Sequence, residues 1–359
     1  MAIPSQVCYN IMQDSKGYIW FSTESGLCQY NGQNLKIFDK KNGLPESSVY
    51  CVKEDDTGKL WFATSKNRIL NFNHDSLIEA PFSKNYASKL KEKLELTYLL
   101  NLTNEGVYMN SQSKTFIAKG SELKSILKPD TSANFYFIKR SNQLIPVNGD
   151  LYTGLKNSAI KARRGYVKII IEENGTKQVV QLPYSKTQYP YWRVLCAQTP
   201  QADFFSVENK LVMLGKGLSF KVIEMPDLII ALYVDKQNGL WVGTRKNGVY
   251  YYHDVSNMNE PMINLNELSV SGICEDGERG VWCSTLEKGI YYCKSKNIVS
   301  YSNLKGFDRS LDLLKNEKGQ VFVSGANNTI IEFDGKLKRT IQNTAKDKRA
   351  IVDILSNVA

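Results

Sequence analysis

The side chains that could carry acid–base chemistry in this sequence are a few carboxylates and two histidines. Neighbouring carboxylates occur at Glu54–Asp55–Asp56 and at Glu275–Asp276, and the histidines are His74 and His253. A general base must lie within hydrogen-bond reach of the proton that it removes. Each carboxylate group instead opens a turn-like phrase that contains glycine, where Asp bonds backbone N–H groups. We therefore expect turn-forming carboxylates, and histidines at the outer edge of their structural modules.

Metal and cofactor chemistry has no motif to support it. The seven cysteines contain no CxxC pair and no metal-ligand spacing, and no P-loop or HExxH motif is present. Several of the cysteines occupy positions that other parts of the sequence fill with apolar residues. The sequence thus predicts free thiols, no metal site, no cofactor and no enzymatic activity in this segment.

A ten-residue phrase recurs five times along the chain. Its Asp or Asn lies six residues before a Trp or Phe, and a Thr follows that aromatic residue by three positions in four copies. Adjacent copies are 40 or 41 residues apart. The copies are DSKGYIWFST (14–23), DDTGKLWFAT (55–64), DKQNGLWVGT (235–244), DGERGVWCST (276–285) and NEKGQVFVSG (316–325).

Each recurring residue type has a structural role. Asp and Gly form a turn, because Asp bonds nearby backbone N–H groups and Gly reaches positive φ. The aromatic residue lies on a short strand, and further apolar strands precede and follow it. Four short strands in about 41 residues are typical of a propeller blade. The predicted blade-building residues are Asp14, Trp20, Thr23, Asp55, Trp61, Thr64, Asp235, Trp241, Thr244, Asp276, Trp282 and Thr285.

The predicted fold is all-β, a β-propeller with seven or eight four-stranded antiparallel blades. The middle of the chain is the least regular part, with an insertion expected around 153–165 and a hairpin at 166–184. The predicted single propeller spans 1–348, and 349–359 begins a following, truncated module. The expected blades lie near 7–40, 47–84, 94–128, 133–185, 190–226, 228–265, 268–303 and 309–342.

Two stretches closely resemble the two-component regulator propeller repeat family: IMQDSKGYIWFSTESGLCQYNG (11–32) and NGLPESSVYCVKEDDTGKLWFAT (42–64). The resemblance implies the sensor propeller of a membrane histidine kinase, often a hybrid one of Bacteroidetes type. It also implies a periplasmic location and further propeller and kinase domains downstream in the same chain. Residues 73–227 depart from the pattern, and the start of the chain lacks a signal peptide.

The candidate ligand site lies at the loops between the second and third strands of the blades, which emerge on one face of a propeller. These loops carry charges of both signs, which suit a small polar ligand, with an oligosaccharide as one candidate. An aromatic residue of the irregular middle region could stack on a sugar. The candidate ligand-binding residues are Glu24, Lys66, Arg68, Arg245, Lys246, Glu287 and Trp192.

Other functions stay open on the sequence. A free-standing lyase-like propeller enzyme is one alternative, and an interaction or dimerisation scaffold, including a homodimer, is another. The net charge of +10 comes from lysines spread along the chain, which indicates a solvated surface and no nucleic-acid partner.

Overall fold

The computed structural model describes residues 3–73, 76–90, 97, 99–103, 106–110, 115–125, 133–140, 143–150, 164–173, 176–185, 195–215, 220–296, 310–316, 318–325, 329–333 and 337–342. The chain divides into two compact units, Met1–Lys296 and Asn297–Ala359. Within the described residues the strands form eight antiparallel sheets, seven in the first unit and one in the second.

Strands follow one another in each sheet in the order of the sequence. The first sheet contains β1 (Cys8–Gln13), β2 (Ile19–Thr23), β3 (Gly26–Tyr30) and β4 (Leu35–Phe38); the second contains β5 (Val49–Glu54), β6 (Leu60–Thr64), β7 (Ile69–Asn73) and β8 (Ser76–Glu79). The third contains β9 (Leu99–Thr103), β10 (Gly106–Asn110), β11 (Thr115–Lys119) and β12 (Glu122–Ser125); the fourth contains β13 (Ala133–Arg140), β14 (Gln143–Asp150), β15 (Arg164–Glu173) and β16 (Thr176–Ser185).

The remaining sheets of the first unit differ in strand number. The fifth contains β17 (Cys196–Gln198), β18 (Ala202–Val207), β19 (Lys210–Gly215) and β20 (Phe220–Glu224); the sixth contains β21 (Ile229–Val234), β22 (Leu240–Thr244), β23 (Val249–Tyr252) and β24 (Met262–Asn264). The seventh has three described strands, β25 (Val270–Glu275), β26 (Val281–Thr285) and β27 (Ile290–Cys293). The second unit contains β28 (Ser310–Lys315), β29 (Val321–Gly325), β30 (Thr329–Phe333) and β31 (Leu337–Gln342).

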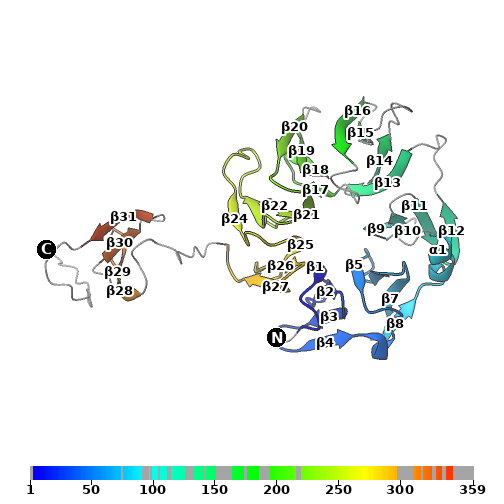
Figure 1. The fold of residues 1–359 in the computed structure, drawn as a ribbon, viewed down its shortest axis with the longest axis horizontal. Helices are drawn as coiled ribbons and strands as arrows, with labels where there is room; N and C mark the ends of the chain where they lie inside the picture. Colours follow the sequence, from blue (N-terminus) through cyan, green and yellow to red (C-terminus); the bar gives the residue numbers. More distant parts are fainter. Residues whose placement is uncertain are drawn as a thin grey trace, which may run out of the picture. The chain divides into compact units, whose positions relative to one another are not determined.

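The seven sheets of the first unit close into a ring (Figure 1). The first strand of each sheet contacts the first strand of the next, from β1 through β5, β9, β13, β17 and β21 to β25. The ring closes where β25 contacts β1 and the Ser271 hydroxyl donates to the Cys8 carbonyl at 2.6 Å. The predicted all-β propeller fold is confirmed, and the first unit is a seven-bladed ring.

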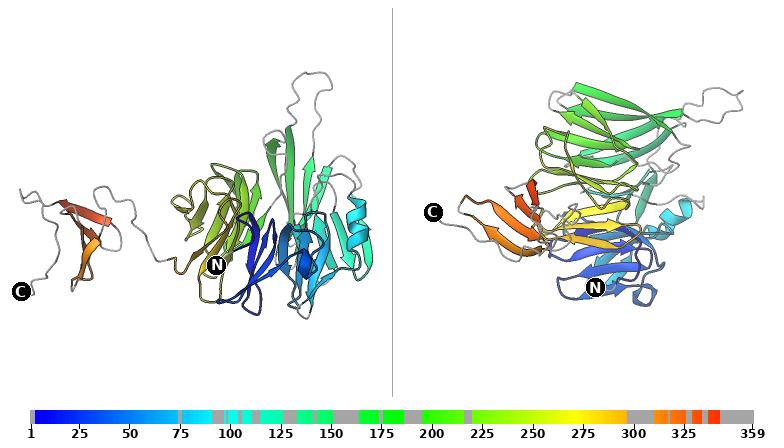
Figure 2. Two further views of the ribbon diagram at one scale, coloured as in Figure 1. Left: turned by 60° about the horizontal axis from the view of Figure 1, so that its bottom comes forward. Right: turned by 60° about the vertical axis from the view of Figure 1, so that its left-hand side comes forward.

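The ends of the predicted domains stay a prediction, because the two units are described separately. Residues 343–359, where a truncated module was expected, lie outside the described residues, as does the expected insertion at 153–165. The hairpin predicted at 166–184 is confirmed as the pair β15–β16. Figure 2 shows this long hairpin in two further views.

Packing between blades depends on the repeated tryptophans. Trp20 lies in one apolar cluster with Val52 and Phe62 of the next blade, and Trp241 packs in the same way against Ile273 and Cys283. Trp282 of the last blade packs against Ile11 and Phe21 of the first. Burial of large aromatic side chains is a major source of stability, so these contacts hold the ring together.

Helical structure in the described residues is short. A 3₁₀ turn, η1 (Lys40–Asn42), follows the first blade, and α1 (Ser83–Lys89) follows β8. Tyr86 of α1 is fully buried, with its ring 5.3 Å from that of Phe116. The helix thus fills the core between the second and third blades. No helix of the described residues has the length and apolar content needed to cross a membrane.

Candidate functional site

The carboxylate of each repeated Asp accepts hydrogen bonds from residues of its own blade. One oxygen of each carboxylate accepts the indole N–H of the Trp six residues on, at 2.7 Å for Trp20, 2.8 Å for Trp61, 3.0 Å for Trp241 and 2.8 Å for Trp282. The other oxygen accepts two backbone N–H groups, such as those of Lys16 and Tyr18 on Asp14. These contacts support the structural role expected for the motif.

The repeated Thr residues fix the hairpin at the opposite end of the second strand. The hydroxyls of Thr23, Thr244 and Thr285 donate to the carbonyls of Gly26, Gly248 and Gly289 at 2.8–2.9 Å. Thr64 donates instead to the Glu46 carboxylate. Gly248 has φ 73°, and a Cβ there would lie 2.2 Å from the Asn264 carbonyl oxygen, so only glycine fits.

The loops between second and third strands form one rim with the connections between blades. Backbone N–H groups at the loop tips donate to carbonyls just before the first strand of the same blade. The bonds join Glu24 to Val7 at 3.1 Å, Ser65 to Ser48 at 3.0 Å, Arg245 to Leu228 at 2.9 Å and Leu286 to Ser269 at 3.0 Å. The predicted candidate residues on these loops therefore lie on one face of the ring.

Three of the predicted rim residues bond neighbouring residues of the chain. Arg68 forms a bidentate hydrogen-bonded pair with Glu79, and this pair is the main cause that raises the pKa of Arg68. Arg245 pairs with Asp227 at 3.1 Å. Glu287 accepts the backbone N–H of Ser269 at 2.9 Å. These bonds brace the loops against the connections between blades.

Most of the predicted rim residues are exposed. Glu24, Lys66 and Lys246 are in this class, as are Arg245 and Glu287, whereas Arg68 is half-buried. Trp192 and His74 lie outside the described residues. The role of the rim residues in ligand binding stays a prediction.

A cavity of about 410 Å³ lies inside the ring, lined by first strands. Its walls include residues of β1, β5, β21 and β25, together with Leu195 just before β17. This volume falls within the range of small-molecule sites. The cavity is therefore the second candidate site, beside the rim.

A repeated bulge sets one end of this cavity. The register of the first and second strands shifts between Cys8 and Asn10 and between Val49 and Cys51. The residues at these shifts, Tyr9 and Tyr50, line the cavity, and their rings meet edge to face with centroids 4.7 Å apart. Bulges commonly redirect side chains near functional sites.

The opposite end of the cavity is rich in charge. Lys53, Lys236 and Glu275 line it there, at the ends of the first strands. Glu275 accepts the backbone N–H of Lys236 at 2.7 Å. The equivalent Glu54 accepts the backbone N–H of Ser15 at 2.8 Å, so both carboxylates join one blade to the next.

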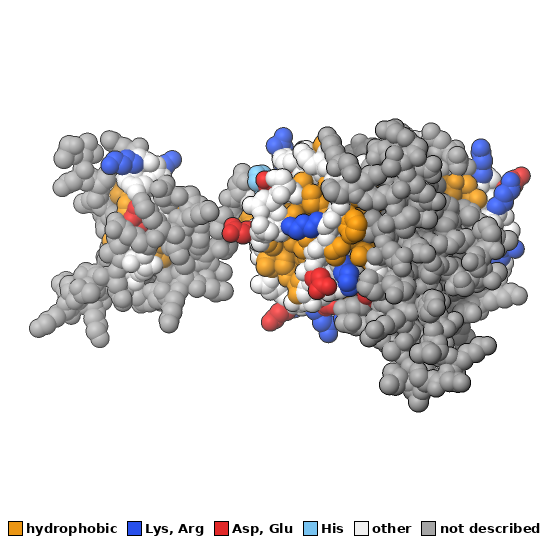
Figure 3. Space-filling view, turned by 90° about the horizontal axis from the view of Figure 1, so that it is seen from above, with side chains coloured by type: hydrophobic (Ala, Val, Ile, Leu, Met, Phe, Trp, Pro, Cys, Tyr) orange, Lys and Arg blue, Asp and Glu red, His pale blue; other side chains and the backbone are white. Residues whose placement is uncertain are grey.

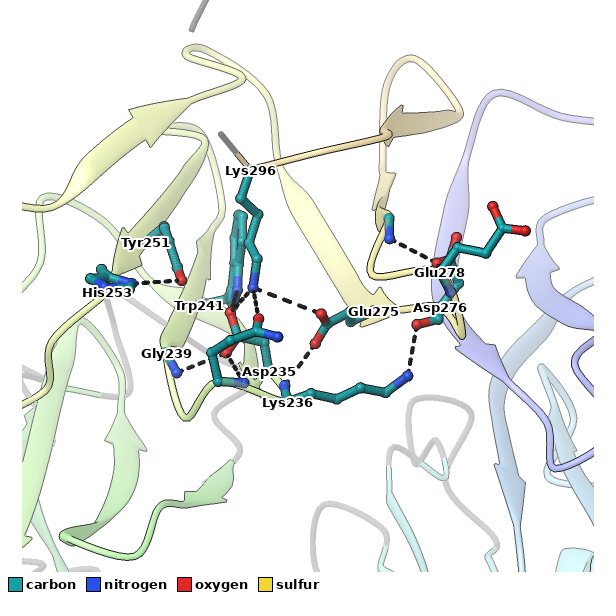
Figure 4. Close-up of polar contacts among 12 residues, drawn as sticks. Asp235, Lys236, Gly239, Trp241, Tyr251, His253, Glu275, Asp276, Glu278 and Lys296 are labelled. Carbon is teal, nitrogen blue, oxygen red and sulfur yellow. Dashed lines mark hydrogen bonds and ion pairs between the residues drawn. The ribbon is translucent and has the colours of Figure 1, made fainter. Parts of the chain in front are cut away.

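Lys296, the last residue of the first unit, bonds two carboxylates near this end of the cavity (Figure 4). Its ammonium lies 2.7 Å from the Asp235 carboxylate and 3.8 Å from that of Glu275. Burial by itself would raise the pKa of Asp235, but hydrogen bonds from Lys296, Trp241 and Gly239 lower it overall. Lys296 thus neutralises two carboxylates between the sixth and seventh blades.

Outside the cavity, apolar side chains are exposed on outer strands. Phe220 and Val222 of β20 and Met262 and Ile263 of β24 are among them. Figure 3 views the ring from the side of β20 and shows hydrophobic side chains gathered around basic ones. Exposed apolar patches commonly mark contact surfaces.

Among the groups considered for acid–base chemistry, Glu275 lines the cavity and accepts the Lys236 backbone N–H, whereas His253 is not part of the lining. His253 is exposed at the end of β23, with Nδ1 3.4 Å from the Tyr251 hydroxyl. None of the seven cysteines, all of which lie in the described residues, is joined by a disulfide. Among the described residues, no group of three or more His, Cys, Asp or Glu residues could hold a metal ion.

Tyr9, Tyr50 and Lys53 of the cavity lining were not predicted from the sequence. A signal for them was present, because Tyr9 and Tyr50 both lie eleven residues before the Trp of their blade. Ile230 and Ser271 occupy this position in the sixth and seventh blades and also line the cavity. Residues that differ at one fixed distance from a constant motif thus mark the surface of the cavity.

Three segments, residues 2–25, 43–66 and 225–246, match the family model described as two component regulator propeller. These segments contain Trp20, Trp61 and Trp241. The predicted resemblance to the two component regulator propeller family is therefore confirmed for these three segments. No curated protein matches the chain.

Solved structures share the fold. The extracellular domain of BT3049 from B. thetaiotaomicron, assigned to a hybrid two component system, is 14% identical, with a TM-score of 0.65 over 95% of this chain and 48% of that one. The extracellular domain of BT4673 from the same organism, assigned in the same way, is 20% identical, with a TM-score of 0.57 over 97% and 47%. This chain thus spans about half the length of either domain.

A streptogramin B lyase structure is also similar, with 16% identity and a TM-score of 0.56 over 81% of this chain and 95% of that one. At such identities these likenesses establish the fold alone. One fold can host both binding and catalysis, so function has to be argued from the site.

Proposed function

We propose that this chain is a ligand-sensing extracytoplasmic propeller of a two-component sensor histidine kinase, and that it carries no catalytic activity of its own. The observation that carries the proposal is the match of three segments to the two component regulator propeller family. The fold shared with extracellular domains of B. thetaiotaomicron two component systems supports it. On this proposal the chain acts in the periplasm, and kinase domains in the same protein supply the output.

The ligand on this proposal is a small polar molecule, with an oligosaccharide as one candidate. Glu24, Lys66 and Lys246 offer accessible charges at the rim, and the central cavity is large enough for a compact ligand. Charged groups around an opening can attract and orient a polar ligand. Recognition would thus begin at the rim face of the ring.

Signal transfer would then depend on movement between domains. The blades of the first unit are joined by buried aromatic clusters, and packed cores resist continuous deformation. A ligand shifts an equilibrium only by its difference in affinity for the two states. We infer that ligand binding changes how the ring associates with neighbouring domains or with a second copy.

A thermal-shift screen of the whole chain against neutral oligosaccharides, sugar acids and small anions tests the proposal. A ligand at about 100 times its Kd should stabilise the chain by about 2.7 kcal/mol. Lys66→Ala or Lys246→Ala should weaken a ligand bound at the rim, whereas Lys221→Ala on the outer strand β20 is the matched control. The absence of any stabilising ligand in a broad panel would contradict ligand sensing by this chain.

A further inference from the structure

The central cavity has different chemistry at its two ends, and this difference narrows the class of ligand. Tyr9 contacts Tyr50, both early in their strands, and Glu275, late in its strand, accepts the Lys236 N–H just after β21. Residues early in the first strands therefore lie at one end of the cavity and residues late in them at the other. Tyr9 and Tyr50 belong to the early positions, and Gln13 and Lys53 to the late ones. The cavity is therefore polarised along its length.

The tyrosine end can bind hydroxyl groups. Tyr9 and Tyr50 are half-buried in the cavity wall, and within the described part of the chain neither hydroxyl has a hydrogen-bond partner. A half-buried phenol can donate to one ligand hydroxyl and accept from another. The ring faces also offer apolar surface to the C–H groups of a polyol.

A negative charge near the tyrosine end disfavours anions there. The backbone of Glu24 bonds Val7 and Ser48, each two residues before one of the tyrosines. Burial is the main cause that raises the pKa of Tyr9 to about 12 and that of Tyr50 above its usual value, and the Glu24 charge adds to both shifts. An anionic ligand group should therefore bind at the other end.

Of the two lysines that line the other end of the cavity, only Lys236 has a hydrogen-bond partner for its ammonium among the described residues. No hydrogen bond or ion pair joins Lys53 to the rest of the chain as far as it is described, whereas the Lys236 ammonium donates to the Asp276 carbonyl at 2.8 Å. The nearby carboxylates are engaged, Glu54 by Ser15 and Glu275 by Lys236 and Lys296. Lys53 is thus the group best placed to pair with a ligand carboxylate.

We propose that the cavity binds a small hydroxylated carboxylate, with its hydroxyl groups at Tyr9 and Tyr50 and its carboxylate at Lys53. This inference rests on the proposed function, because it names the ligand class of a sensing site. Tyr50 and Lys53 are three residues apart on one strand, or about 10 Å at roughly 3.3 Å per residue. A sugar ring that carries a carboxylate can span much of this distance, and the lysine side chain can cover the remainder.

Calorimetric titration of the whole chain with D-glucuronate and with D-glucose tests this inference, since the two sugars differ mainly in charge. D-glucuronate should bind at least about tenfold more tightly than D-glucose, because a charge-assisted hydrogen bond contributes about 1.5–3 kcal/mol. Lys53→Met should remove most of this preference. Tyr50→Phe should weaken both sugars by about threefold. Lys221→Met, at an exposed position of the outer strand β20 and outside the cavity lining, is the matched control.

Three results would each overturn the inference: D-glucuronate does not bind, the two sugars bind equally, or Lys221→Met weakens binding as much as Lys53→Met. These results are separable from failure of the proposed function. If a neutral oligosaccharide stabilises the chain while D-glucuronate does not bind, the result supports ligand sensing by this chain and contradicts a carboxylate site in the cavity. Lys53 is exposed, so Lys53→Met should leave the unfolding midpoint unchanged, which confirms that any loss of binding is local.

Discussion

The two units carry the same repeated phrase but bury it differently. In the second unit Asn316 occupies the position that is Asp in the other copies. The Asn316 side chain accepts the backbone N–H of Gln320 at 3.0 Å, and the Asn316 backbone carbonyl accepts that of Gly319 at 3.0 Å. The turn is thus preserved. Leu313, however, is 64% exposed, whereas Ile11 at the equivalent position of the first blade is 3% exposed.

The comparison separates two roles of the repeat. Ile11 is buried because Trp282 of a neighbouring blade packs against its cluster. Phe322 and Val323, the counterparts of Trp20 and Phe21, are only half-buried, although the strands and turn of the second unit are formed. Local sequence therefore makes the turn and the strands, and the neighbouring blade supplies the burial.

The largest effect is expected when the buried aromatic residue of the first blade is removed. Trp20→Ala deletes a fully buried side chain that contacts Phe38, Phe62 and Phe72, and should cost about 3–5 kcal/mol of unfolding free energy. All five tryptophans lie in the first unit, so urea unfolding followed by tryptophan fluorescence reports on the ring. Phe322→Ala, in the other unit, should leave this transition unchanged.

A smaller loss should follow from breaking the ion pair between the sixth and seventh blades. Asp235→Asn leaves the Lys296 ammonium, 14% exposed, without its 2.7 Å partner, which should cost about 3 kcal/mol. The double variant Asp235→Asn/Lys296→Met should lose less than the sum of the two single losses in the same urea experiment. Additive losses would show that the pair contributes no coupling energy.

Because Asp235 is ionisable and Asn316 is not, the contribution of Asp235 to stability should depend on pH. The folded-state pKa of Asp235 is lowered, despite burial that by itself would raise it, because Lys296, Trp241 and Gly239 donate to the carboxylate. Its contribution to stability is therefore present above the unfolded pKa of about 3.9 and is lost as pH falls through the lower folded pKa. The difference in unfolding midpoint between the natural chain and Asp235→Asn should shrink below about pH 4, and a constant difference would contradict this role.

The smallest effect is expected at Leu313, whose equivalent in the first blade, Ile11, is buried. Leu313→Ala removes more atoms than Ile11→Val but from an exposed side chain, so it should change stability by at most about 0.5 kcal/mol. Ile11→Val should cost about 0.5–1.5 kcal/mol. Hydrogen exchange of each unit measures both. A larger loss from Leu313→Ala would mean that its side chain is covered in solution.

Much of the fold was predictable because the motif is local. Asp14, Trp20 and Thr23 lie within ten residues, and their hydrogen bonds are made inside that stretch or with Gly26. The spacing of the motif therefore predicted the blades. The candidate site was less predictable: Arg68 and Arg245 looked free in the sequence, but they pair with Glu79 and Asp227, 11 and 18 residues away.

The sequence by itself determined the turns, the strands and the structural role of the Asp–Trp–Thr motif, because those interactions join residues close along the chain. Only the tertiary structure decided that the first unit closes as a ring of seven blades, with β25 beside β1. It alone also brought Tyr9, Tyr50 and Lys53 into one cavity. Ring closure depends on contacts between residues more than 260 positions apart, such as Ser271 with Cys8, and no local pattern encodes them.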